Sequence, residues 1–333
     1  MKPVSRVGIV AKLRLHAVAA HLVDTAAWLE ARGVEPVFET ETAALGGVGA
    51  GRRSASRDEL PALVDLLLVF GGDGTLLGMA DRVAEHGVDI PILGVNFGHL
   101  GFLTDVAWAD MLPVLENAIA GRAGIDHRLV LDASVHRRGE EVARRFALND
   151  VVVTRGALSR VISLSVTVGG EFVASFHGDG LIVASPTGST AYNLSAGGPI
   201  VHPCVDALVL TPIAPHMLSN RPVVIPASSH VVLQPVNLEA GQEVFVSIDG
   251  QSGFPIEPGD AIRVARHDRP VRLIESASHS YFEVLRKKLK WAERSVRNWR
   301  RDRRDRKQAI GAQRCGGAAR RSSARLSRKY WIW

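Results

Sequence analysis

The chain has 333 residues, 46% of them hydrophobic, which is enough to bury the cores of two domains. Its net charge of +6 is unevenly distributed, because residues 1–285 hold 22 basic and 31 acidic side chains, whereas residues 286–333 hold 18 and three. The high pI therefore comes from the C-terminal segment alone, and it does not make the whole protein a nucleic-acid binder.

The sequence shows no membrane or export signal. No run approaches the roughly 20 consecutive apolar residues of a membrane span, and residues 1–5 lead into the strand-like residues 7–10 without a secretory pattern. We therefore expect a cytoplasmic protein with no membrane partner. Cys204 and Cys315 have no metal or redox spacing, so the sequence predicts neither a disulfide nor a metal site made by the chain.

Residues 1–125 alternate short apolar runs with helical periodicity, which predicts a Rossmann-like open α/β domain. Residues 42–56 are rich in Gly, Ala and Arg and are expected to form a loop. The expected strands cover residues 7–10, 37–38, 63–70 and 92–95, and the expected helices cover residues 17–32, 75–86 and 108–120.

From about residue 126 the pattern changes to β-branched runs separated by turns, which predicts an all-β domain over residues 126–267. Residues 190–197 are the exception and could form one helix. The expected strands cover residues 129–135, 147–154, 162–168, 181–184, 230–233, 244–248 and 261–264.

The chain is then expected to return to the first domain and complete it with residues 268–291. Residues 271–274 look like a strand, and residues 281–290 have the pattern of an amphipathic helix. Residues 292–333 are rich in Arg, Gly, Ala and Ser, a composition that cannot bury a core and predicts a disordered basic tail.

The segment Gly71-Gly72-Asp73-Gly74-Thr75 joins a buried strand to a helix. Its glycines let the backbone approach a ligand closely, and the helix that follows directs free N–H groups at an anion, so we predict a phosphate-binding loop. Asp73 is unusual there, because a carboxylate repels phosphate. Its use is either to accept the proton of a hydroxyl or to hold Mg²⁺. A plain turn at the end of a strand is the alternative.

Four further segments combine glycines with polar residues. They are Gly94 to Leu103, Ala147 to Asp150, Gly178 to Pro199 and Leu210 to His216. Together with the glycine loop they resemble the NAD kinase family in order and spacing, over residues 4–290. The resemblance implies an N-terminal domain like that of diacylglycerol and phosphofructo-type kinases, followed by an all-β domain that binds NAD. It also implies ATP-dependent phosphorylation of the adenosine ribose 2′-hydroxyl of NAD, which gives NADP.

The resemblance assigns roles to single residues as well. It makes Asp73 the catalytic residue that contacts the ribose hydroxyls, and it places Asp179 at the nicotinamide half, from the same or a neighbouring subunit. Relatives usually have Asn-Glu where this chain has Asn149-Asp150, so ligand contact by Asp150 is left open. The implied NAD-binding residues are Gly74, Phe102, Asn149, Asp150, His177, Asp179, Thr190, Ala191, Tyr192, Ser195, Thr211 and Ala214.

Structural interpretations of several of these residues stay open. Asn149-Asp150 could be a strand-end turn, His177 stands where many relatives have arginine and could be structural, and Thr211 would suit a β-domain core. Asp249-Gly250-Gln251 has the sequence of a hairpin turn.

Two other functions compete with the NAD kinase interpretation. A diacylglycerol-type lipid kinase shares the glycine loop, and a non-catalytic dinucleotide sensor would combine the same fold with a polyanion-binding tail. The leading hypothesis implies Mg²⁺ or another divalent cation with ATP, NAD and ATP as the small-molecule partners, a homodimer or homotetramer, and non-specific polyanion binding by the tail.

Overall fold

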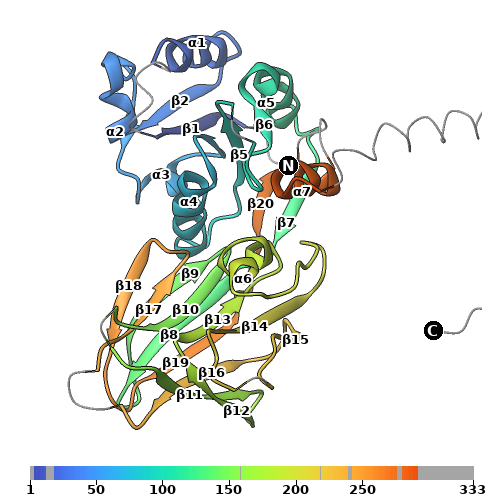
Figure 1. Ribbon diagram of the computed structural model, residues 1–333. Coiled ribbons are helices and arrows are strands. Elements are labelled where there is room, and N and C mark those ends of the chain that lie inside the picture. The colour runs from blue at the N-terminus through green and yellow to red at the C-terminus, as the bar shows by residue number, and fades with distance from the viewer. Residues whose placement is uncertain are drawn as a thin grey trace, which may run out of the picture. The chain divides into compact units, whose positions relative to one another are not determined.

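The computed structural model describes residues 4–12, 19–98, 100–157, 159–217, 219–238, 242–275 and 280–291 (Figure 1). The chain divides into two compact units, Met1–Ser280 and Tyr281–Trp333. In the second unit the structure describes helix α7 (Tyr281–Leu289), which confirms the expected amphipathic helix. The predicted tail, residues 292–333, lies outside the described residues. No helix of the described part is long and apolar enough to cross a membrane.

The strands β1 to β7 and the late strand β20 form an eight-stranded sheet in the order β3-β2-β1-β4-β5-β20-β7, with β6 beside β5. Its pairs are parallel except β20 with β7. The strands are β1 (Arg6–Ala11), β2 (Glu35–Glu39), β3 (Ser54–Ala55), β4 (Leu66–Phe70), β5 (Pro91–Asn96), β6 (Val106–Ala107), β7 (Ile125–Arg128) and β20 (Val271–Ile274). The return of β20 confirms that the chain comes back to the first sheet.

Helices cover both faces of this sheet because its central strand is apolar throughout. In β4, Leu68 and Phe70 pack into a core with α1 (Ala19–Glu30) and α5 (Met111–Ile119). Leu67 and Val69 face the other way, into a core with α3 (Leu60–Leu63) and α4 (Asp73–Glu85). Figure 1 shows the two helix pairs on opposite sides of the sheet.

The strands β8 to β19 form two antiparallel six-stranded sheets around one core. One sheet has the order β15-β14-β13-β10-β17-β18, and its strands are β10 (Asp150–Arg155), β13 (Gly180–Ala184), β14 (Ala207–Ile213), β15 (Val223–Pro226), β17 (Val244–Ile248) and β18 (Ser252–Ile256). The other has the order β12-β11-β16-β19-β8-β9, and its strands are β8 (Leu131–Arg137), β9 (Glu140–Ala147), β11 (Ile162–Val168), β12 (Glu171–Gly178), β16 (Val231–Val236) and β19 (Ala261–Arg266). The expected fold class, α/β followed by all-β, is therefore confirmed, while the expected domain boundaries stay a prediction.

Several local expectations need correction. The segment 42–56 is not a plain loop, because α2 (Thr40–Ala43), a 3₁₀ helix (Leu45–Gly47) and β3 lie in it. The central strand begins at Leu66 rather than Leu63, since α3 precedes it. Helix α4 begins at Asp73 rather than Thr75, so the carboxylate lies in its first turn. Residues 190–197 form a 3₁₀ helix (Thr187–Thr190) and α6 (Tyr192–Ser195), separated by the non-helical ψ of −130° at Ala191.

Candidate functional site

The phosphate loop follows the carboxyl end of β4. The N–H of Gly71 donates to the carbonyl of Val95 at 2.9 Å, which ties the loop to β5. Gly72 precedes the first turn of α4 in an extended conformation. A Cβ on Gly72 or Gly74 would have no atom of the protein within 4 Å, so the backbone there faces open space. The loop therefore offers a surface to which a ligand can come close.

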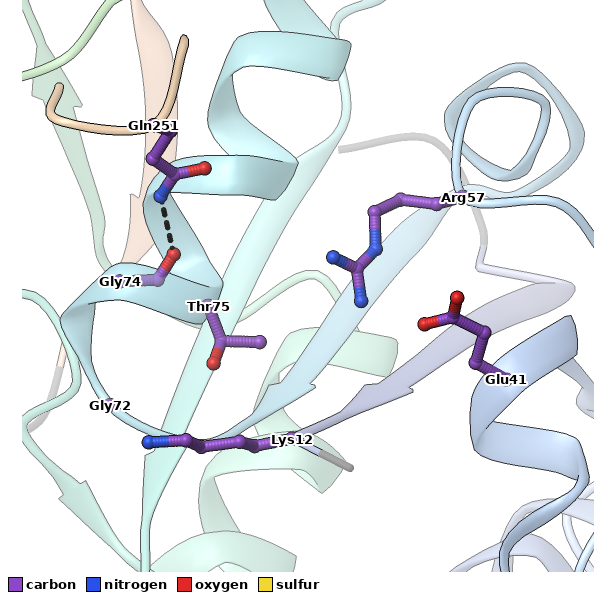
Figure 2. A pocket seen from close by; sticks show the side chains of 7 residues that line it. All are labelled: Lys12, Glu41, Arg57, Gly72, Gly74, Thr75 and Gln251. Carbon is purple, nitrogen blue, oxygen red and sulfur yellow. Dashed lines mark hydrogen bonds between the residues drawn. The ribbon is translucent and has the colours of Figure 1, made fainter. Parts of the chain in front are cut away.

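A pocket of about 440 Å³ lies against this loop. Figure 2 shows the side chain of Lys12 reaching toward Gly72 and the guanidinium of Arg57 directed into the same space. The charges of both side chains favour an anion. The lining residues are Lys12, Glu41, Arg57, Gly72, Gly74, Thr75 and Gln251.

The fold explains why these residues meet. Lys12, Glu41 and Arg57 each follow the carboxyl end of a parallel strand, namely β1, β2 and β3, and such ends lie on one edge of a sheet. Arg57 is fixed by Glu39, which is 1% exposed and accepts from its Nε at 2.6 Å. Thr42 Oγ1 donates to the other carboxylate oxygen of Glu39 at 2.5 Å. Sequence reasoning missed Lys12 and Arg57, although the strand-end rule could have indicated them.

Asp73 is turned toward the loop that follows β5. Its Oδ1 accepts from the N–H groups of Leu103 and Thr104 at 3.1 and 3.0 Å and from the Thr104 hydroxyl at 3.0 Å. Among the described residues, only the N–H of Phe102 donates to its Oδ2, at 2.9 Å. A Cβ on Gly101 would collide with Oδ1, so the loop can pass the carboxylate only with glycine there. The structure thus brings Asp73 and Phe102 together.

Asn149 and Asp150 lie where the chain passes from β9 to β10. The N–H groups of Leu148, Asn149 and Asp150 all donate to the Asp249 carboxylate, at 2.8, 2.8 and 2.9 Å. On the opposite side, Ser185 donates from its Oγ to the Leu148 carbonyl at 2.5 Å and from its N–H to the Asn149 carbonyl at 2.9 Å. This backbone is therefore held from both sides, and the Asn149 side chain has no part in these bonds.

Two carboxyl groups lie near each other at this turn, that of Asp150 buried and that of Asp249 half-buried. Burial, together with the neighbouring charge of Asp249, raises the pKa of Asp150 to about 7, against the N–H of Tyr192, which favours the ionised form. Burial likewise raises the pKa of Asp249 to about 6, although its three N–H donors act in the opposite direction. Asp150 has the higher pKa because it has fewer donors to stabilise its charge.

The Ser185 to Gly198 segment forms a compact bend packed on Asn149. A Cβ on Gly188 would collide with the Asn149 backbone, so the close approach requires glycine. Among the predicted NAD-binding residues of the bend, Thr190 and Ala191 are half-buried, Ser195 is exposed, and Tyr192 is 45% exposed. The Tyr192 side chain is thus accessible to a ligand.

Asn193, fully buried in the same bend, has a structural role. Its Nδ2 donates to the carbonyls of Ser189 and Pro199 at 2.9 and 3.0 Å, and its Oδ1 accepts from the Thr211 hydroxyl at 2.6 Å. Thr211 is itself fully buried in β14. The Thr211 hydroxyl therefore anchors the bend to β14, which is the structural interpretation that its sequence left open.

Asp179, which is predicted to bind the nicotinamide half, directly follows β12 in the chain. It accepts from Nε of Arg155 at 2.6 Å, an ion pair that sequence reasoning missed. His177 is exposed on β12, with its Nδ1 2.8 Å from the Ser163 hydroxyl and its ring 5.3 Å from that of His216. Ala214, at the end of β14, has a φ of +42°, uncommon for a residue with a side chain.

Comparisons with known proteins agree over both halves of the chain. Residues 7–123 match the model of the ATP-NAD kinase N-terminal domain, and residues 148–276 match that of the ATP-NAD kinase C-terminal domain. The chain is 45% identical over 294 residues to an NAD kinase from Geotalea daltonii, which covers 87% of this chain and 99% of that protein. It is 44% identical over 291 residues to an NAD kinase from Ralstonia nicotianae, covering 87% and 94%.

Solved structures give the same fold. The crystal structure of yeast NADH kinase complexed with NADH superposes with a TM-score of 0.78 at 27% identity, over 88% of this chain and 89% of that one. An NAD kinase from Archaeoglobus fulgidus in complex with ATP superposes with a TM-score of 0.65 at 24% identity, over 86% and 98%.

Proposed function

Because the chain belongs to the NAD kinase family and therefore phosphorylates NAD to NADP, we propose that the phosphoryl group passes to NAD beside Asp73, from ATP phosphates held in the pocket of Figure 2. Family membership decides against the lipid kinase and the non-catalytic sensor. One observation supports this location of the active site: a pocket lined by two cations, an open glycine loop and a carboxylate lie together at one edge of the sheet.

The donor end of the site consists of Lys12, Arg57 and the loop Gly71-Gly72-Asp73-Gly74-Thr75. The two cations and the N–H groups at the start of α4 supply the positive potential that a triphosphate needs. Mg²⁺ or another divalent cation enters with ATP, because it is usually held by the phosphates and only one or two carboxylates. Glu41 lines the pocket and is a candidate for such a ligand.

Asp73 Oδ2 is the proposed acceptor atom. A carboxylate oxygen has about two lone-pair sites. From the residues that the structure describes, Oδ1 accepts three hydrogen bonds and Oδ2 accepts one. The ribose 2′-hydroxyl oxygen attacks the γ-phosphorus, the bond from that phosphorus to the β–γ bridging oxygen breaks, and ADP leaves. The hydroxyl proton passes to Oδ2.

The acceptor nucleotide is proposed to lie between the loop at Phe102 and the bend that contains Tyr192. The exposed ring of Tyr192 offers a stacking face for the adenine. The half-buried side chain of Asn149 takes no part in the bonds that hold its backbone, and its amide can read the adenine edge. Asp179, paired with Arg155, is proposed for the nicotinamide half. Thr211 has its hydroxyl on Asn193, so its part in the site is to hold the bend.

A homodimer or homotetramer is proposed as well. Edge strand β12 exposes Phe172 (67%) and Val173, and edge strand β15 exposes Val224. The outer edge of such a strand, together with exposed apolar side chains, favours pairing with another copy. Light scattering of the protein and of Phe172→Asp would test this, because the proposal expects a lower mass for the variant if β12 lies in the interface.

The function is tested by product analysis. Purified protein incubated with ATP, Mg²⁺ and NAD should give NADP in amounts equal to the ADP formed, and the variant Arg57→Ala should need a higher ATP concentration. ATP hydrolysis without NADP would refute the proposed acceptor. If Arg57→Ala needs the same ATP concentration as wild type, ATP does not bind in this pocket.

A further inference from the structure

A carboxylate is buried behind the phosphate pocket, where a negative charge weakens anion binding. Glu39 is the last residue of β2 and is 1% exposed. Nε and Nη2 of Arg57 lie 2.6 and 2.5 Å from its Oε1, and the Thr42 hydroxyl lies 2.5 Å from its Oε2. Burial of a carboxylate is costly unless the group is paired and hydrogen-bonded. The three side chains are therefore held together as a unit.

The Arg57 guanidinium has two edges, and Glu39 occupies one of them. Nε and Nη2 form the edge that faces the carboxylate. A guanidinium carries five N–H groups in a fixed planar fork, so Nη1 and one N–H of Nη2 remain for a second partner. Figure 2 shows the guanidinium directed into the pocket. Arg57 can therefore bind a phosphate oxygen while it stays bound to Glu39.

Thr42 extends this unit to the strand that leads to Lys12. Its hydroxyl accepts the N–H of Ala11 at 2.9 Å. An N–H can only donate, so the single hydroxyl proton is left for Glu39 Oε2. Thr42 is fully buried in α2, and Lys12 directly follows Ala11, the last residue of β1. One buried carboxylate thus connects the backbone beside Lys12 with the side chain of Arg57, and both cations line the pocket.

We propose that Glu39 is a positioning residue for the phosphoryl donor and that Thr42 supports it. Glu39 holds the guanidinium of Arg57 so that its outer edge meets the ATP phosphates. The negative charge of Glu39 weakens the attraction of the pocket for phosphate, but a side chain that is already fixed loses less freedom when the ligand binds. Neither Glu39 nor Thr42 needs to touch ATP. The inference rests on the proposed location of ATP in this pocket.

Glu39→Gln separates positioning from charge, because the two effects have opposite signs. Removal of a negative charge behind the pocket would by itself strengthen ATP binding. If the carboxylate positions Arg57, the variant should instead raise KM for ATP about three- to tenfold, the range expected for one hydrogen bond, and leave KM for NAD within about twofold. The matched control is Glu30→Gln, which removes the same charge from an ion pair with Nε of Arg52 at 2.6 Å. It should change neither KM.

Arg57→Lys tests the need for two edges. Lysine keeps the positive charge, but its ammonium group is a compact charge that lacks the planar fork. We expect Arg57→Lys to lose about as much affinity for ATP as Arg57→Ala. In the Arg57→Ala background Glu39→Gln should have little further effect on KM for ATP, since the side chain that it positions is gone.

A pair of variants tests Thr42. Thr42→Val removes the hydroxyl from Glu39 and from the Ala11 N–H, so KM for ATP should rise, whereas Thr42→Ser keeps the hydroxyl and should have the wild-type KM. The Tm and KM for NAD of every variant separate a loss of folding from a change at the donor pocket. If Thr42→Ser and Thr42→Val have the same KM for ATP, Thr42 does not support the donor site.

The outcomes separate this inference from the proposed function. If Arg57→Ala raises KM for ATP while Glu39→Gln lowers it or leaves it unchanged, Arg57 acts through its charge alone and the inference is wrong. It is also wrong if Arg57→Lys binds ATP as wild type does, or if Glu39→Gln raises both KM values equally. A wild-type KM for ATP in Arg57→Ala would refute the proposed location of ATP, and the inference with it.

Discussion

The backbone of Gly101 lies directly against the Asp73 carboxylate, leaving no room for a Cβ at residue 101. The contact arises because the loop that contains Phe102 donates four hydrogen bonds to Asp73. Asp73 therefore organises part of the proposed NAD site in addition to any chemical role. Its replacement must be interpreted with both effects in mind.

Asp73→Asn should lower kcat by about 10² to 10⁴, the usual contribution of a positioned acid/base group. KM for NAD should also rise, because an amide nitrogen cannot accept the N–H bonds of the loop. Thr104→Val is the control, since it removes one hydroxyl bond to Oδ1 and keeps the carboxylate. Equal losses in the two variants, measured by steady-state kinetics, would mean that loop order and not proton acceptance explains the effect.

Gly72→Ala should fold normally and bind ATP more weakly. A Cβ there meets no protein atom within 4 Å, so the methyl group occupies only the space that we assign to phosphate. We expect KM for ATP to rise at least fivefold, with a loss of stability below about 1 kcal/mol from the poorer helix cap. Gly253→Ala in β18, with a nearest atom 3.5 Å from the new Cβ, is the matched control. Equal ATP kinetics for both variants would contradict the phosphate assignment.

The fold was predictable at several strands along which burial alternates. Strand β11 has the burial pattern of a half-buried strand, and its bounds were predicted without error. Strand β9, which is polar and mostly exposed, was missed because its apolar side chains are few. Strand β14 was missed because it contains Pro212, which usually argues against a strand. Its partner β15 begins opposite Leu210, so Pro212 lies beyond that pairing.

The site was predictable only where its signal is local. The glycine loop and the bend around Tyr192 are continuous in sequence, and the structure places their backbones as a loop and a compact bend. Arg57, Arg155 and Gln251 each depend on a partner 18 or more residues away, namely Glu39, Asp179 and Gly74. Such contacts are created by strand order, and no short motif contains them.

Tyr192→Ala should raise KM for NAD about tenfold and leave KM for ATP within twofold. Stacking of a base on an aromatic ring is worth roughly 1 to 3 kcal/mol in other nucleotide sites, and the ring is 45% exposed. Tyr192→Phe keeps the ring and should retain most of the affinity. If isothermal titration finds the same NAD affinity for the Ala variant and wild type, the adenine lies elsewhere.

Truncation after Glu293 should leave kinase activity and thermal stability nearly unchanged. The removed segment is rich in Arg, Gly, Ala and Ser and has the composition of a chain that buries no core. Its basic charge should make full-length protein bind heparin at low salt and release it as salt rises, whereas the truncated protein should pass through a heparin column. Loss of activity on truncation would show that the segment supports the enzyme.

Asp150→Asn should make the protein more stable at pH 8, although it lies in the proposed NAD site. The pKa of Asp150 is about 7 in the folded state against an ordinary value of 3.8, because burial and the charge of Asp249 disfavour ionisation. Between about pH 4 and pH 7 the folded protein therefore holds a proton that the unfolded chain has lost, and the contribution of this group to stability falls as pH rises through that window.

An asparagine cannot ionise, so the Tm of the variant should exceed that of wild type by at least about 2 °C at pH 8, and the difference should shrink toward pH 4. Asp24→Asn, at an exposed position of α1, should leave the Tm unchanged at both pH values. A variant less stable than wild type at pH 8 would mean that the ionised Asp150 is stabilised in the folded state, contrary to the raised pKa.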